Sequence, residues 1–166
     1  LEFRRVLFRS GFSRSRSQSR NVADRPNLAA SGSNNPTEGS SVGCGVIAAG
    51  EKLGGPERYF DPCAFVLPDI GFYGNLGRNT LLGPGFINVD FSLVKATNIS
   101  ERWKTEFRFE VFNLANHANF GLPSNSVLNA PPAATPNALS YRGAAGTITT
   151  TSNTSRQIQF GLKVSF

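Results

Sequence analysis

The sequence predicts an all-β fold: the C-terminal strands of a transmembrane antiparallel β-barrel, a fragment with about three long strands and two long loops. Apolar and polar side chains alternate without interruption in residues 156–166, and nearly so in residues 86–95 and 103–112. Such alternation is typical of a strand with one apolar face. The last eleven residues, tilted as in a barrel, would span about 28 Å along the membrane normal, which matches an outer-membrane hydrocarbon band.

The final segment is expected to be a strand with its apolar row on one side and its polar row on the other. The apolar row consists of Ile158, Phe160, Leu162, Val164 and Phe166. Because the chain ends on this pattern, we expect it to end inside a sheet.

The two earlier segments are expected to form an antiparallel hairpin, because residues 96–102 between them are a short polar link. Pairing near Lys95 and Trp103 makes the paired numbers sum to an even value, so odd residues meet odd residues. Both apolar rows then share one face, which only Thr105 interrupts, and we expect that face to contact lipid. The rows are Ile87, Val89, Phe91 and Leu93, and Trp103, Phe107, Phe109 and Val111.

A soluble β-sandwich is the alternative, since its strands also carry one apolar face. Sandwich strands average about five or six residues, whereas these segments have ten or eleven. The polar row of residues 103–112 holds charges at alternate positions, which suit a water-filled barrel lumen. These charged residues are Lys104, Glu106, Arg108 and Glu110. The pattern therefore favours the membrane barrel.

Residues 1–20 are interpreted as a non-native or disordered segment. Residues 1–10 (LEFRRVLFRS) resemble a translated sequencing adapter, and the chain contains no Met, so we expect a fragment of a longer protein. The first twenty residues contribute +5 of the formal net charge of +6, which leaves +1 for the remainder. The arginine–serine tract of residues 13–20 has no aromatic platform or folded module beside it, so no nucleic-acid partner is expected.

Two long loops are predicted, residues 21–85 and residues 113–155, the second lying inside the strand region 86–166. Both are rich in Gly, Pro, Asn, Ser or Thr and lack helical periodicity. Loops of this length count against a compact soluble domain, whereas barrels combine short periplasmic turns with long extracellular loops. Aromatic residues such as Tyr59 and Phe65 indicate that the later half of the first loop is packed.

No catalytic, cofactor-binding or metal-binding set is predicted, and the protein is not expected to be an enzyme. His117 is the only histidine, and we expect it to be a polar residue at the junction of a strand and a loop, without a ligand role. Glu106 and Glu110 would lie about 13 Å apart on one strand, too far for a glycosidase pair. Residues 43–48 match the letters of a dinucleotide-binding motif, but polar sequence precedes them where a strand is required.

Cys44 and Cys63 are the only cysteines, and they lie nineteen residues apart in the first loop. Two cysteines in a loop of an exported protein pair more often than they bind metal. We therefore expect a disulfide between Cys44 and Cys63.

Five segments, in order, resemble the C-terminal part of TonB-dependent outer-membrane receptors. The likeness is greatest to the Oar-like branch, which carries an N-terminal carboxypeptidase-regulatory-like domain. The segments are residues 58–65 (RYFDPCAF), 72–80 (FYGNLGRNT), 83–93 (GPGFINVDFSL), 107–117 (FRFEVFNLANH) and 156–166 (RQIQFGLKVSF). The resemblance covers residues 24–166 and implies a barrel of about twenty-two strands, closed by an N-terminal plug domain.

The resemblance also implies a location in the outer membrane, contact with its lipid, and uptake of an unknown ligand. The TonB complex would act through an N-terminal part that this chain lacks. The last strand would be read by the barrel-assembly machinery, and we expect recognition by strand addition, with a glycine allowing close backbone approach. The candidate signal consists of Phe160, Gly161, Leu162, Val164 and Phe166. The alternatives are a fragment of a porin or adhesin translocator, and a soluble β domain that binds a partner.

Overall fold

The computed structural model describes residues 2–6, 16, 24–30 and 37–166. The chain divides into two compact units. The strand unit contains Gly85–Phe120 and Thr151–Phe166, and the loop unit contains Phe3–Pro84 and Gly121–Thr150, where these are described. Within the described ranges the elements are β-strands and one short 3₁₀ helix, which confirms the all-β prediction, and no helix is long and apolar enough to cross a membrane.

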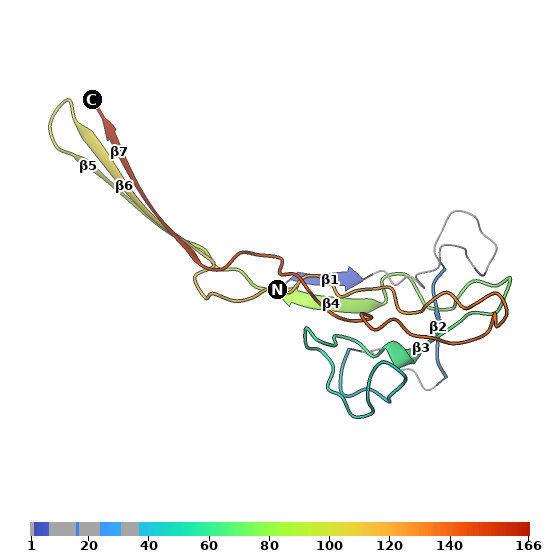
Figure 1. The fold of residues 1–166 in the computed structure, drawn as a ribbon. Helices are drawn as coiled ribbons and strands as arrows, with labels where there is room; N and C mark the ends of the chain where they lie inside the picture. The colour runs from blue at the N-terminus through green and yellow to red at the C-terminus, as the bar shows by residue number, and fades with distance from the viewer. Residues whose placement is uncertain (1, 7–15, 17–23, 31–36) are drawn as a thin grey trace. The chain divides into compact units, whose positions relative to one another are not determined.

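Three strands form the sheet of the strand unit, in the order β5-β6-β7 (Figure 1). They are β5 (Phe91–Asn98), β6 (Lys104–Phe112) and β7 (Gln157–Ser165), and each pair is antiparallel. The bounds of β6 and β7 lie within one residue of the segments predicted from alternation. Their side chains alternate between the two faces because successive strand residues point to opposite sides.

The β5–β6 register keeps the predicted parity but not the predicted pair. Lys95 lies opposite Phe107 and not near Trp103, because β5 continues to Asn98 and the connecting turn is shorter than expected. Backbone hydrogen bonds from Ile99 and Ser100 to the Trp103 carbonyl, 2.9 and 3.3 Å long, close that turn. The paired numbers still sum to an even value, so the apolar rows share a face as predicted.

The first predicted strand, residues 86–95, is wrong in its N-terminal half. β4 (Leu81–Phe86) ends at Phe86, and β5 begins only at Phe91. Between them, the Asn119 side chain donates to the Ile87 carbonyl and accepts from the Ile87 amide, both at 2.7 Å. The Asn119 side chain therefore binds the backbone groups of Ile87 that a neighbouring strand would otherwise bind, and strand pairing is interrupted here.

The short strand β1 (Glu2–Val6) pairs with β4. Residues 2–6 are therefore ordered as a strand, unlike the disordered segment expected for residues 1–20. The pairing says nothing about whether these residues are native. Strand pairing uses backbone groups, so any extended segment can occupy an open strand edge. Apart from Arg16, the other residues of 1–20 lie outside the described residues.

The loop unit contains short elements inside what the sequence predicts as one long loop. They are β2 (Asn27–Leu28), the 3₁₀ helix η1 (Pro62–Ala64) and β3 (Phe65–Val66), and β2 pairs with β3 in antiparallel fashion. Asp61 caps η1 and Pro62 begins it, a combination that favours a helix start because proline has no amide hydrogen to satisfy.

One hydrophobic core joins the two predicted long loops. Phe60 and Phe65 from the first loop are fully buried, and their rings lie 5.8 Å apart in an edge arrangement. Val127 and Leu128 from the second loop are equally buried. The core consists of Phe60, Ala64, Phe65, Leu76, Leu81, Val127, Leu128 and Ala145. The two loops therefore fold together, a feature that the sequence pattern did not predict.

Candidate functional site

The sheet of the strand unit carries an exposed apolar face. Phe160 and Leu162 on β7 are 67% and 69% exposed, and Leu93 on β5 is 52% exposed. Apolar exposure on this scale marks a surface that contacts lipid or another protein. The register places its members side by side: Phe91, Leu93, Phe107, Phe109, Ile158, Phe160, Leu162 and Val164. Val111, which was predicted to belong to the same lipid-facing row, is only 5% exposed.

Aromatic rings pack across this apolar face from strand to strand. The Phe109 ring centre lies 5.2 Å from that of Phe160 and 6.3 Å from that of Phe91. Near the turn, the Trp103 and Phe166 ring centres lie 5.4 Å apart. Pairs of this kind contribute about 0.5–1.5 kcal/mol each beyond burial, so they help to fix the alignment of β5, β6 and β7.

The opposite face of the sheet is polar and charged. Arg108 donates to Oε1 of Glu106 at 2.7 Å, and the Ser92 hydroxyl donates to Glu110 at 3.5 Å. Lys163 of β7 lies opposite Glu106 in the register. The Glu106–Arg108 pair is open to solvent and contributes little stability, so this face is suited to contact with water.

Strand β7 forms one edge of the sheet, and in the described part of the chain it pairs with β6 alone. An edge strand offers unpaired amide and carbonyl groups, which strand addition uses for affinity. Phe160, Leu162 and Val164 of the candidate assembly signal lie in one row on β7, and Phe166 beyond it is 93% exposed.

Gly161 has no steric role against β6. A Cβ atom at this position would lie 3.5 Å from Cβ of Arg108, an ordinary van der Waals contact. The expected close backbone approach is therefore not needed on the β6 side. The role of Gly161 in the assembly signal stays a prediction, and it concerns the edge of β7 that faces away from β6.

Asparagine side chains organise the chain where β6 ends. The buried Asn113 side chain donates to the carbonyl groups of His117 and Thr154, at 3.1 and 3.0 Å, and accepts from the His117 amide at 3.0 Å. The Asn113 amide donates to Asp90 at 2.9 Å. With φ of 52°, Asn113 occupies the left-handed region, which asparagine tolerates well. His117 thus contributes backbone groups to a structural junction.

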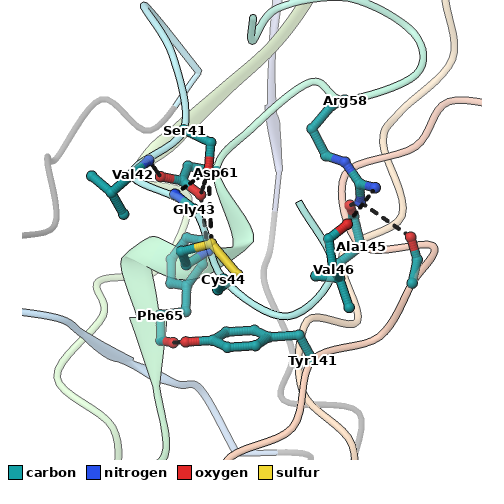
Figure 2. Close-up of a disulfide and its surroundings, with 12 residues drawn as sticks. Ser41, Val42, Gly43, Cys44, Val46, Arg58, Asp61, Phe65, Tyr141 and Ala145 are labelled. Carbon is teal, nitrogen blue, oxygen red and sulfur yellow. Dashed lines mark hydrogen bonds between the residues drawn. A yellow bond between two sulfur atoms is a disulfide. The ribbon is translucent and has the colours of Figure 1, made fainter. Parts of the chain in front are cut away.

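A disulfide joins Cys44 to Cys63 in the loop unit (Figure 2). Beside it, the Asp61 carboxylate accepts from the Ser41 hydroxyl at 2.8 Å, the Cys63 amide at 3.0 Å and the Val42 amide at 3.2 Å. Asp61 is buried, so these donors replace the water that it loses on folding. In the sequence Asp61 falls within the predicted loop of residues 21–85, and nothing there indicates that it binds the segment around Ser41.

Two side chains, those of Arg58 and Tyr141, join the two predicted long loops within the loop unit (Figure 2). The Arg58 guanidinium donates to the carbonyl groups of Gly143, at 3.1 Å, and Ala145, and also to that of Val46, at 3.4 Å. The Tyr141 hydroxyl donates to the Phe65 carbonyl at 3.1 Å. Sequence analysis did not single out these residues, because carbonyl partners leave no side-chain pattern to recognise.

The residue types that hold metal ions are scattered in the described part of the chain. Among the residues that the structure describes, no group of three or more His, Cys, Asp or Glu side chains is placed to hold a metal ion. Residues 43–48 form a tight turn in which Cys44 and Ile47 exchange backbone hydrogen bonds of 2.9 and 3.2 Å. A dinucleotide site needs a strand, a glycine turn and a helix, and none of that sequence of elements is present here.

Comparison with protein families decides the class. The family model of the outer membrane beta barrel domain matches residues 6–159. The chain belongs to this family. No curated protein gives a match, and neither does any solved structure.

The outer-membrane barrel protein is located in the outer membrane, and the three-stranded sheet is a fragment of its barrel. Strands of such barrels alternate between a lipid-facing apolar row and a lumen-facing polar row. The two faces of β5, β6 and β7 have this division, which accounts for the exposure of so many Phe, Leu and Val side chains.

We predict that the loop unit of this barrel protein loses stability at alkaline pH through Tyr141. Burial, and secondarily the charge of Asp61, raises the pKa of Tyr141 above its ordinary value. The stabilising contribution is therefore fully present below about pH 10, the ordinary tyrosine pKa. It is lost as the pH rises through the higher pKa of the folded state, because a phenolate cannot donate to the Phe65 carbonyl.

Phenolate absorbance during a pH titration of the full protein measures this effect. Tyr141→Phe should remove a component that ionises above the ordinary tyrosine pKa. An absorbance titration in which Tyr141→Phe removes only a component that ionises at the ordinary tyrosine pKa would contradict the prediction.

Proposed function

We propose that this chain is the C-terminal barrel part of a TonB-dependent receptor that takes up a ligand across the outer membrane. The observation that carries the proposal is the joint folding of the two long loops around Phe60, Phe65 and Leu128. A receptor needs a defined loop surface to select its ligand, and a shared core with cross-links such as Arg58 to Ala145 supplies one. The order of the five receptor-like segments supports the same proposal.

Each part of the chain has a role in this proposal. The loop unit lies outside the cell and contributes to ligand binding, while the charged face of β6 lines the lumen. The plug domain and the segment that contacts the TonB complex belong to the protein N-terminal to this chain. The last strand is read by the barrel-assembly machinery, and the apolar face contacts outer-membrane lipid.

A porin is the second candidate. The charged row of β6 supports it, because such a row suits a water-filled lumen. A receptor and a porin differ in whether the lumen is closed. Plugged barrels hold a folded domain in the lumen, whereas porins leave an aqueous channel.

Conductance of the full-length parent in planar lipid bilayers tests the proposal. A receptor should give no steady ion current, and deletion of the domain encoded upstream should open a large current. The control is the same bilayer prepared without protein, which should stay silent. Steady current through the intact parent, or no upstream plug domain in the gene, would overturn the receptor proposal and favour the porin.

A further inference from the structure

Residues 39–53 of the loop unit form a small hairpin, here called the flap. Ser41 donates its amide to the Glu51 carbonyl at 2.9 Å, and Leu53 donates to the Gly39 carbonyl at 3.0 Å. Gly43 and Gly50 have φ of +88° and +84°, a region that glycine enters without strain. The flap therefore has its own backbone hydrogen bonds and can keep its shape without the rest of the unit.

The flap has little apolar contact with the rest of the loop unit. Its buried residues Ile47 and Leu53 cluster with Cys63, and Cys44 and Val46 pack against them. This cluster is separate from the main core around Phe60 and Leu128. The apolar surface that holds the flap in place is accordingly small, and other attachments must carry most of the binding.

Those other attachments all come from one short stretch, residues 58–63. Cys63 holds the flap covalently through Cys44, Asp61 accepts from Ser41 and Val42, and Arg58 donates to Val46. Besides the backbone at its two ends, the disulfide is the covalent attachment of the flap, and it holds the hydrogen-bonded groups near one another (Figure 2). Without it, each of these bonds competes with water.

A hinge adjoins the flap at Gly54 and Gly55. Gly54 has φ of +87°, and a Cβ atom at Gly55 would meet nothing within 4 Å. An open hollow lined by residues 51–58 borders this turn. The flap therefore has a glycine pair at one end, where the backbone is free to change conformation, and open space beside it.

We propose that residues 39–53 are a redox-controlled flap, released when a low-molecular-weight monothiol reduces the Cys44–Cys63 disulfide. Cys44 is partly exposed and Cys63 is buried, so the external thiolate attacks Sγ of Cys44 and Cys63 leaves as the thiolate. A second monothiol resolves the mixed disulfide. Two monothiols thus become one external disulfide, and the two cysteines take up the two electrons and two protons. Release exposes Ile47 and frees the Arg58 donor from Val46, while the main core remains folded.

Hydrogen–deuterium exchange on the full-length parent in outer-membrane vesicles, with and without reduced glutathione, tests the flap. Reduction should speed exchange at least tenfold in peptides from residues 39–53 and leave peptides from residues 125–129 unchanged. The double variant Cys44→Ser, Cys63→Ser should exchange fast without glutathione and show no further response. Ser41→Ala is the matched control, because it removes a hydrogen bond to Asp61 but keeps the disulfide, so it should still respond to glutathione.

Three results would overturn the flap. Alkylation of both cysteines in untreated native vesicles would show that the disulfide is absent. Unchanged exchange of residues 39–53 after glutathione treatment would show that a monothiol does not release the flap. Equal acceleration in residues 125–129 would show that the whole loop unit unfolds and that no separate flap exists.

Discussion

Replacing Phe109 with lysine should lower the free energy of unfolding of the full-length barrel by about 2–4 kcal/mol, the cost of a charged side chain on the lipid face near the bilayer midplane. Phe109 lies on the apolar face between Leu93 of β5 and Phe160 of β7, and its ring packs against that of Phe160. Lysine would lose this contact and place an ammonium group among acyl chains. Urea unfolding of the parent in lipid vesicles measures the loss.

Glu110→Lys is the matched control, because it introduces the same side chain one residue away on the opposite face. Glu110 accepts a 3.5 Å hydrogen bond from Ser92 and lies on the polar face. A lysine there remains in contact with water, so the loss should be much smaller. Equal losses from the two substitutions would contradict the assignment of the apolar face to lipid.

Deleting Phe166 from the full-length parent should reduce its surface level by about tenfold or more. Phe166 is 93% exposed, and apart from the ring pair with Trp103, at a centre distance of 5.4 Å, it adds little to the fold. Its loss should therefore act on recognition of the last strand by the assembly machinery, which reads an edge strand through its backbone and alternate side chains. Unassembled precursor should be degraded in the periplasm.

Surface labelling with quantification of the periplasmic precursor checks this prediction. Phe166→Trp is the conservative control and should assemble close to normally, whereas Phe166→Asp should behave like the deletion. Normal surface levels without Phe166 would rule out its role as an assembly signal. Low levels with an unchanged unfolding free energy of the assembled fraction would distinguish failed assembly from instability.

The sheet could be predicted well from the sequence where its own residues decide the structure. Alternation located β6 and β7 to within one residue, because one apolar and one polar face require a period of two. The parity of the hairpin register followed from the same pattern. The exact partner of Lys95 could not be predicted, because shifting the turn by two residues keeps the same side chains on each face.

Distant partners account for what the sequence did not predict. The strand expected across residue 87 is interrupted by the Asn119 side chain, which lies 32 residues away. The shared loop core brings Phe60 and Ala145 into one cluster, and neither loop has a periodicity that indicates the other. Asp61 was predicted only as part of a long loop, and both its capping of η1 and its Ser41 and Val42 donors become visible only in three dimensions.

The two halves of the loop core are separated in the chain by the hairpin of β5 and β6, and this sets an order of events during export. The Tyr141–Phe65 and Arg58–Ala145 hydrogen bonds span 76 and 87 residues, whereas the disulfide spans 19. Distant contacts close slowly because more chain entropy is lost before they form. The precursor therefore reaches the oxidising periplasm able to form its disulfide early, while Phe60 and Phe65 still lack their partners. That stage exposes apolar side chains to water, and exposed apolar surface of this kind favours aggregation.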